Sequence, residues 1–158
     1  MGMKGAMAAP ALSQPISVGV VPERLAAMVL YVAEKAGRFL PSDAAGRARV
    51  HEWLFHVATD VSPTSSSIYY LSNQLPERPT AAIRLFEDRL ARFLRNIDHR
   101  LGQVEFLAGA LSVADLTFFP NYLARRSTVE ELGGLTHLRR WADQMAARPA
   151  VERMMKIG

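Results

Sequence analysis

Apolar residues recur at spacings of three and four between Thr80 and Leu101, and this pattern narrows the possible folds more than any other feature of the chain. The stretch reads TAAIRLFEDRLARFLRNIDHRL. Its large apolar residues are Ile83, Phe86, Leu90, Phe93, Leu94, Ile97 and Leu101. Such spacing matches the 3.6-residue turn of an α-helix and places these side chains on one face. The pattern predicts a long amphipathic helix with one buried side.

The same periodicity indicates helices in most of the remaining chain, and no segment shows the strict alternation of a strand. We expect further helices over about 23–36, 43–61 and 112–126, in LRRWADQMAAR, and from near Pro149. The apolar stripe of the second is Val50, Trp53, Leu54, Val57 and Val61. Pro63 should break or kink the chain there, with a helical piece, SSSIYYLSNQ, beyond it. The sequence therefore predicts an all-α fold, packed as a helical bundle.

The first predicted helix poses a question of burial, because apolar residues form a stripe along it. Leu25, Met28, Val29, Val32 and Ala36 fall on one face of the 23–36 helix. Leaving that face in water would forfeit about 1.5–3 kcal/mol for each large side chain. We expect the 43–61 helix or a second copy of the chain to cover it.

Ser112 and Asp115 lie three residues apart within an apolar neighbourhood, and their spacing is typical of a capping box. The Ser112 hydroxyl can accept a bond from the N–H of Asp115, and the carboxylate can reach back to the N–H of Ser112. Leu111 and Leu116 occupy the positions of a hydrophobic staple. The pair predicts that a helix begins at residue 112.

Composition and charge exclude several classes of function. The 158-residue chain contains no cysteine, which rules out disulfides, zinc–thiolate sites and cysteine nucleophiles within it. The net charge of +4 raises a nucleic-acid hypothesis. However, Arg84, Asp88 and Arg92 alternate in sign at spacings of four, as on a solvated helix face. No aromatic residues interleave with them for base stacking, so nucleic-acid binding is not expected.

Other sequence signals for a membrane or a metal are equally weak. No apolar run approaches the roughly 20 residues that span a bilayer, and the first 15 residues do not resemble a signal peptide. A cytoplasmic protein without membrane contact is the expectation. His51 and His56 are five residues apart, which separates them by about 140° on a helix, so we expect no metal site.

The order of four stretches carries a resemblance to a known family. They are FLPSD at 39–43, RARVHEWL at 47–54, EFLAGALSVADLTFFP at 105–120 and HLRRWADQMAARPAVERMM at 137–155. Together they closely resemble the C-terminal helical domain of the glutathione S-transferase superfamily, over roughly residues 23–157. The resemblance implies that Ser112 and Asp115 are a buried folding element.

The resemblance also implies that most of the family's thioredoxin-like domain is missing from this sequence. Family members begin with a thioredoxin-like domain that binds glutathione, and here residues 22–37 resemble only its last helix. We therefore divide the chain into a flexible N-terminal segment, 1–21, and a helical domain, 22–158. In the family that helix opens with an acidic residue or Gln followed by Ser, which hold glutathione. Glu23 matches, whereas Arg24 stands in place of the Ser, so both are weak candidates for glutathione contact.

The resemblance places an apolar ligand pocket and the dimer axis near the 43–61 helix. Phe55 points away from the buried stripe of that helix, which makes it, with His56 and Thr59, a candidate for apolar ligand or dimer contact. Tyr69 and Tyr70 are consecutive, so at most one can face the core, and the other could line the same cleft.

Two functions stay open on this basis. The chain is either a helical ligand-binding or oligomerisation module that lacks a recognisable glutathione site and transferase activity of its own, or an active glutathione-dependent transferase. In the second case its site is rebuilt from the N-terminus or across a dimer, with glutathione as co-substrate. We expect a homodimer and no bound cofactor, and no catalytic residue is predicted.

Overall fold

The computed structural model describes residues 25–156, and within that range every regular element is a helix. The elements are α1 (Leu25–Ala36), α2 (Ala44–Phe55), the π-helix η1 (His56–Val61), α3 (Ser62–Asn73), α4 (Thr80–Leu101), α5 (Val113–Ala124), α6 (Arg126–Leu132), α7 (Thr136–Ala146) and α8 (Pro149–Met155). This confirms the predicted all-α bundle. The sequence pattern did not predict α6. None of these helices is both long and apolar enough to cross a bilayer.

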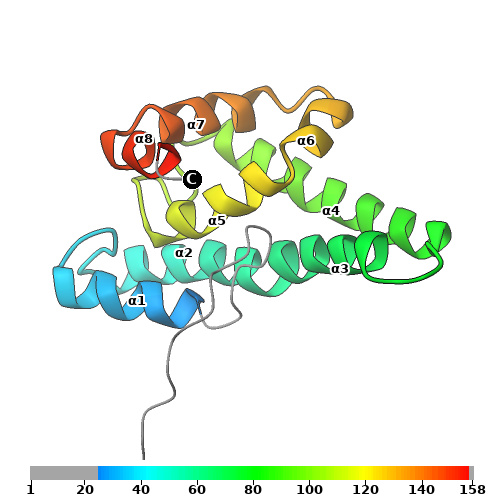
Figure 1. The fold of residues 1–158 in the computed structure, drawn as a ribbon. Helices are drawn as coiled ribbons and strands as arrows, with labels where there is room; N and C mark the ends of the chain where they lie inside the picture. The colour runs from blue at the N-terminus through cyan, green and yellow to red at the C-terminus, as the bar shows by residue number, and fades with distance from the viewer. Residues whose placement is uncertain (1–24, 157–158) are drawn as a thin grey trace, which may run out of the picture.

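The helices pack around α5, which lies in the middle of the molecule (Figure 1). In that view α2, η1 and α3 form one continuous long helix, and α4 follows the turn at the end of α3. The main contacts join α3 to α4, α2 and α1 to α5, and α4 to α7. The helices α6, α7 and α8 lie on the other side of α5 from α1 and α2.

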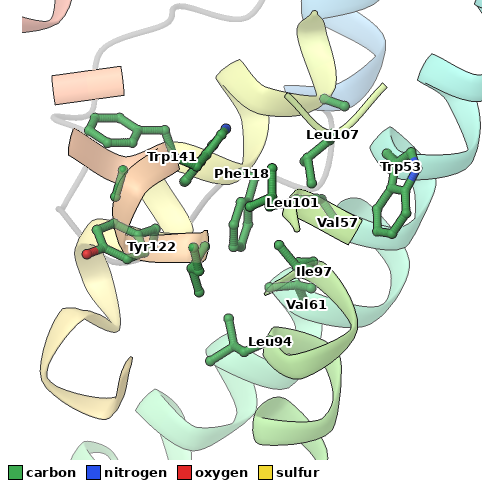
Figure 2. Packing of buried hydrophobic residues seen from close by; sticks show 14 of the residues in the cluster. Trp53, Val57, Val61, Leu94, Ile97, Leu101, Leu107, Phe118, Tyr122 and Trp141 are labelled. Atoms are coloured by element: carbon green, nitrogen blue, oxygen red, sulfur yellow. The ribbon is translucent and has the colours of Figure 1, made fainter. Parts of the chain in front are cut away.

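The core is formed where α2, η1, α4, α5 and α7 meet (Figure 2). Val57 and Val61 of η1 face the apolar stripe of α4, and the aromatic side chains of α5 and α7 close the other side. All five residues of the stripe predicted for the 43–61 helix are buried. Of the α4 stripe, Phe86 and Phe93 are half-buried and the other five residues are buried. The apolar periodicity therefore identified the principal core correctly.

Pro63 does not break the helix as predicted; the backbone widens into η1 just before it. The N–H of Ser62 bonds to the carbonyl of Val57, five residues back, instead of to the residue four back. A proline inside an α-helix lacks an N–H and its ring clashes with the carbonyl four residues earlier. One wider turn relieves both problems, so the chain stays helical from residue 44 to residue 73.

The face of α1 that packs inward is not the one predicted. Ala33 is buried, and Ala26, Val29 and Leu30 pack against the core, because α1 lies on α5. Met28 and Val32 are 62% and 61% exposed, so the expectation that the 43–61 helix covers them is wrong. Both sides of α1 are apolar, and its periodicity alone could not distinguish the inner side from the outer.

Hydrogen bonds from side chains fix α4 against α7. A carboxylate oxygen of Asp98 accepts the N–H of Leu138 at 2.8 Å, in the first turn of α7. The Arg140 guanidinium donates to the carbonyls of Leu101 and Val104, at 2.8 and 3.1 Å, where α4 ends. These bonds satisfy backbone groups that helix ends leave without partners. They orient α7, which carries Trp141 into the core.

Gly46 lies where α2 begins and has no room for a side chain. Its N–H donates to the Asp43 carboxylate at 2.7 Å, and a Cβ at Gly46 would lie 2.7 Å from that carboxylate and 2.8 Å from the Cβ of Pro41. Gly46→Ala is therefore expected to lower the free energy of unfolding by about 1–2 kcal/mol, despite the better helix propensity of alanine. Urea unfolding followed by circular dichroism measures this. Ala48→Ser, an exposed change in the same helix, is the control, and equal losses in both variants would contradict the steric account.

Candidate functional site

Phe55 and Thr59 form an exposed apolar spot on the long helix, at the junction of α2 and η1. The Phe55 side chain is 52% exposed, and the His51 ring meets it edge-on at 6.2 Å between centroids. The Thr59 hydroxyl donates to the carbonyl of Phe55 at 2.8 Å. This bond uses the hydroxyl proton within the helix, so the spot offers apolar contact rather than a free hydroxyl donor.

His56 lies between the same two residues in sequence but belongs to a different environment. Its ring meets Trp53 and Phe93 edge-on, with centroids at 5.7 and 5.4 Å, and its side chain is only 15% exposed. Nδ1 lies 2.9 Å from a carboxylate oxygen of Asp60. Nε2 is buried and has no hydrogen-bond partner in the described part of the chain. The ring of His56 therefore packs between Trp53 and Phe93 in the described residues, with Nε2 turned away from solvent.

Tyr69 and Tyr70 lie near the far end of the long helix. They are 38% and 40% exposed, and their rings contact each other edge-on at 5.7 Å. Fourteen residues of helix separate Tyr69 from Phe55, which is about 20 Å at 1.5 Å per residue. The structure therefore separates the predicted contact residues into two exposed spots and one packed histidine.

Met28, Tyr31 and Val32 make up the outer face of α1, a second exposed apolar surface. Their side chains are 62%, 63% and 61% exposed, and they lie one turn apart or adjacent. Glu23 and Arg24, the candidates for glutathione contact, precede this helix and lie outside the described residues. Met28 and Val32 belong to the stripe for which the sequence predicted a cover, either the 43–61 helix or a second copy, whereas the exposure of Tyr31 beside them was not predicted.

Asp115 organises the buried centre of the domain through four hydrogen bonds. One carboxylate oxygen accepts the N–H of Leu107 and the indole N–H of Trp141, both at 3.0 Å. The other accepts the N–H and the hydroxyl of Ser112, also at 3.0 Å. Both halves of the capping box are present, so α5 begins immediately after Ser112. Burial raises the pKa of the Asp115 carboxyl, while the four hydrogen bonds act in the opposite direction.

Arg125 links the end of α5 to the first turn of α3. Its Nε donates to the Ser65 hydroxyl at 2.7 Å, and its guanidinium also donates to the Ser65 carbonyl. Burial lowers the pKa of this guanidinium, and the charge of Glu87 acts against that shift. No sequence pattern predicted this bridge, because the two residues are 60 positions apart.

A shallow groove of about 500 Å³ lies where α4 ends and α7 begins. Arg95, His99, Gln103 and His137 line it, and the glycine pair at 133–134 forms part of its wall. The Gln103 amide and the His99 ring are bonded at 3.1 Å, which fixes one side of the groove. No sequence pattern pointed to it, because its residues come from two helices and a loop.

Residues 59–156 match the sequence profile described as "Glutathione S-transferase, C-terminal domain". That match covers more than half of the chain. The chain belongs to the glutathione S-transferase family. This confirms the resemblance carried by the Ser112–Asp115 motif and the four ordered stretches, and it agrees with the helical architecture.

The glutathione S-transferase relatives are longer than this chain. "Disulfide-bond oxidoreductase YghU" of Escherichia coli (strain K12) is 30% identical over 134 residues, which are 80% of this chain and 46% of the relative. Glutathione transferase YghU of Streptococcus pneumoniae, solved in complex with glutathione, shares 29% identity at a TM-score of 0.76. The match covers 85% of this chain and 55% of that one. The chain therefore spans about half the length of these relatives.

A further glutathione transferase, from Burkholderia graminis, has the same helical arrangement, with a TM-score of 0.73 at 25% identity. The match covers 82% of this chain and 57% of that protein, which was solved with two glutathione molecules bound per subunit. Glutathione S-transferase relatives of this kind thus share the helical half with the present chain.

Proposed function

We propose that this chain is a helical ligand-binding or oligomerisation module of the glutathione S-transferase family, with no glutathione site and no transferase activity of its own. The observation that carries the proposal is the exposed spot formed by Phe55 beside His51 and Thr59. Activating a thiol requires an aimed donor or a helix N-terminus in a shielded site. The Thr59 hydroxyl is already bonded to its own helix, and the ring of Phe55 offers apolar area instead.

The exposed aromatic spot fits a small ligand with an apolar ring or aliphatic body. A half-exposed Phe buries further area when such a ligand stacks on it, at about 25 cal/mol for each Å². The apolar outer face of α1 supports the second half of the proposal, because exposed apolar surfaces of this kind are typical of interfaces. A homodimer in the cytoplasm is the arrangement we propose.

The alternative is a glutathione-dependent enzyme, and the relatives favour it. A protein 30% identical to this chain is named a disulfide-bond oxidoreductase, and two similar structures hold glutathione. On this alternative, glutathione is a co-substrate that binds near Glu23 and Arg24 or across a dimer. A second polypeptide could also supply the half that the relatives possess in addition.

A calorimetric titration with reduced glutathione, combined with a conjugation assay on an aryl halide, distinguishes the helical module from the glutathione-dependent enzyme. The module predicts no saturable heat up to millimolar glutathione and no product above the uncatalysed rate. Saturable binding with turnover would contradict it and establish the enzyme. Saturable binding without turnover would also contradict a module that has no glutathione site of its own.

Phe55→Ala is expected to weaken binding of an apolar fluorescent probe, anilinonaphthalene sulfonate, by about tenfold. The lost ring removes roughly 1–2 kcal/mol of apolar contact. Leu85→Ala is the matched control, because Leu85 is 64% exposed on α4, among charged neighbours. A fluorescence titration measures both variants. Equal weakening by both, or no effect of Phe55→Ala, would show that the ligand spot lies elsewhere.

A further inference from the structure

The shallow groove where α4 ends and α7 begins has no part in the function proposed above, yet four polar side chains meet in it. Arg95 and His99 are four residues apart on α4, which places them on one side of that helix, and Gln103 follows just after its end. His137 comes from the first turn of α7 and lines the same groove. A volume of about 500 Å³ is within the range of small-molecule sites. The groove therefore combines the size of a ligand site with polar side chains from two helices.

The two histidine rings of the groove are held in place by neighbouring residues. The amide nitrogen of Gln103 lies 3.1 Å from Nε2 of His99. The ring of His137 lies against Gly102, because a Cβ at Gly102 would come within 3.1 Å of its Nε2 and Cδ2. Glycine at this position leaves the space that the ring occupies. Both imidazoles are therefore positioned at the groove before a ligand arrives, which lowers the cost of binding.

The charged side chains of the groove favour an anionic ligand. Arg95 has no ion-pair partner within residues 25–156, and Arg92, one turn earlier on α4, has none there either. Asp98 is the one carboxylate of the lining, and one of its oxygens accepts the N–H of Leu138 at 2.8 Å. That bond sets the carboxylate against the positive N-terminal end of α7, which offsets part of its charge. The guanidinium of Arg95 thus remains available to a ligand.

Apolar contact is scarce in the groove, so a ligand there must be held through polar groups. Leu135 is the only large apolar side chain of the lining within the described residues, and it is 4% exposed. Gly133 and Gly134 form the adjoining wall without side chains, and their φ angles of 60° and 69° favour glycine. At Phe55, by contrast, the aromatic ring itself is exposed. The two surfaces therefore suit ligands of opposite chemistry.

We propose that this groove is a second ligand site, which binds a small polar molecule through a phosphate monoester group. It does not depend on the function proposed above. The guanidinium of Arg95 presents planar pairs of N–H groups that match two phosphate oxygens, and its charge adds attraction. The imidazoles of His99 and His137 add N–H donors from α4 and from α7. Donors from more than one side suit the three oxygens of a tetrahedral phosphate better than the two oxygens of a planar carboxylate.

The groove is separate from both exposed apolar surfaces described above. In Figure 1, α7 and the end of α4 lie on the other side of α5 from α1. Phe55 lies on the long helix, whereas the groove is formed by α4, α7 and the loop that precedes α7. Substitutions in the groove can therefore be tested without altering either apolar surface.

Nuclear magnetic resonance of the isotope-labelled full chain, titrated with glycerol 2-phosphate at constant ionic strength, tests the proposal. Amide signals of residues 95–103 and 133–137 are expected to shift in a saturable way, with a Kd of about 5 mM or tighter. Inorganic phosphate is expected to shift the same signals, and acetate to bind at least about fivefold more weakly. No saturable shift of these signals up to about 20 mM would overturn the site. Equal affinity for acetate, or binding of inorganic phosphate without the ester, would overturn the assignment of a phosphate monoester.

Three variants decide whether the groove itself binds the ligand. Arg95→Gln is expected to weaken binding of glycerol 2-phosphate by about fivefold, and His137→Gln by about threefold. Arg84→Gln removes the same charge from an exposed position of α4 outside the groove and is expected to leave the affinity unchanged. All three side chains are exposed, so circular dichroism is expected to show unchanged helicity. Equal weakening by Arg95→Gln and Arg84→Gln would mean attraction by net charge alone and would overturn the proposal, as would unchanged affinity in both groove variants.

Discussion

Asp115→Ala is expected to lower the free energy of unfolding by about 3–5 kcal/mol, among the largest losses available to a single change in this chain. The substitution removes the acceptor for two backbone N–H groups, one hydroxyl and one indole N–H, all at 3.0 Å. Each buried donor left without a partner costs about 1–3 kcal/mol, partly recovered by the Ser112 hydroxyl and by water. Urea unfolding followed by circular dichroism gives the difference.

Two variants sharpen this experiment. Asp143→Ala removes an exposed carboxylate from α7 and should change stability by less than about 0.5 kcal/mol. Asp115→Asn keeps the shape and one acceptor oxygen, but its amide turns a donor toward the N–H of Ser112, so an intermediate loss of about 2 kcal/mol is expected. If Asp115→Ala cost no more than Asp143→Ala, the four bonds would contribute nothing measurable.

Trp141→Ala is the second large effect, with an expected loss of about 4–5 kcal/mol. Trp141 is fully buried, and its ring lies within 5.0–6.1 Å of the rings of Phe118, Phe119 and Tyr122. Truncation leaves a large cavity among these aromatic side chains and frees the indole's acceptor on Asp115. Urea unfolding, followed by circular dichroism because the change removes one of two tryptophans, measures the loss.

A double-mutant cycle separates the hydrogen bond of Trp141 from its packing. Trp141→Phe keeps an aromatic ring but removes the indole N–H, and its cost should shrink by about 1–2 kcal/mol when Asp115 is already alanine. Trp53→Phe, a change of the same size at a nearly buried tryptophan of α2, should cost the same with and without Asp115. If the stability losses of the Trp141 and Asp115 substitutions were additive, the 3.0 Å hydrogen bond from the indole to the carboxylate would contribute no measurable stability.

Local features were predictable from the sequence because their partners are a few residues away. The helix over 80–101 follows from its own apolar spacing. The capping box joins Ser112 to Asp115, which are one helical turn apart. The hydrogen bonds that Asp115 accepts from Leu107 and Trp141 were not predictable. Leu107 and Trp141 are 8 and 26 positions away, and only the packing of α7 brings the indole to the carboxylate.

The structure also differs from the sequence prediction at Pro63 and at α1, and each difference has its own physical cause. A proline within a helical pattern can end, kink or widen the helix, and the pattern around Pro63 does not choose among these outcomes. At α1 both sides are apolar, so only the position of α5 decides that Ala26, Val29 and Leu30 face inward. For the candidate site, the exposure of Phe55 followed from its place off the buried stripe. The packing of His56 on Phe93 depends on α4 and could not be predicted locally.

The four hydrogen bonds that Asp115 accepts affect the order in which the chain can fold during synthesis. Ribosomes deliver residues 107–124 well before residue 141, so a nascent chain carries the carboxylate while its indole partner is still absent. Burying a charge with an incomplete set of donors is costly, so we expect the centre of the domain to stay open to water until α7 emerges. On this expectation, Asp115 makes closure of the domain conditional on the arrival of α7. Fragments that stop short of Trp141 should remain open and be exposed to proteases.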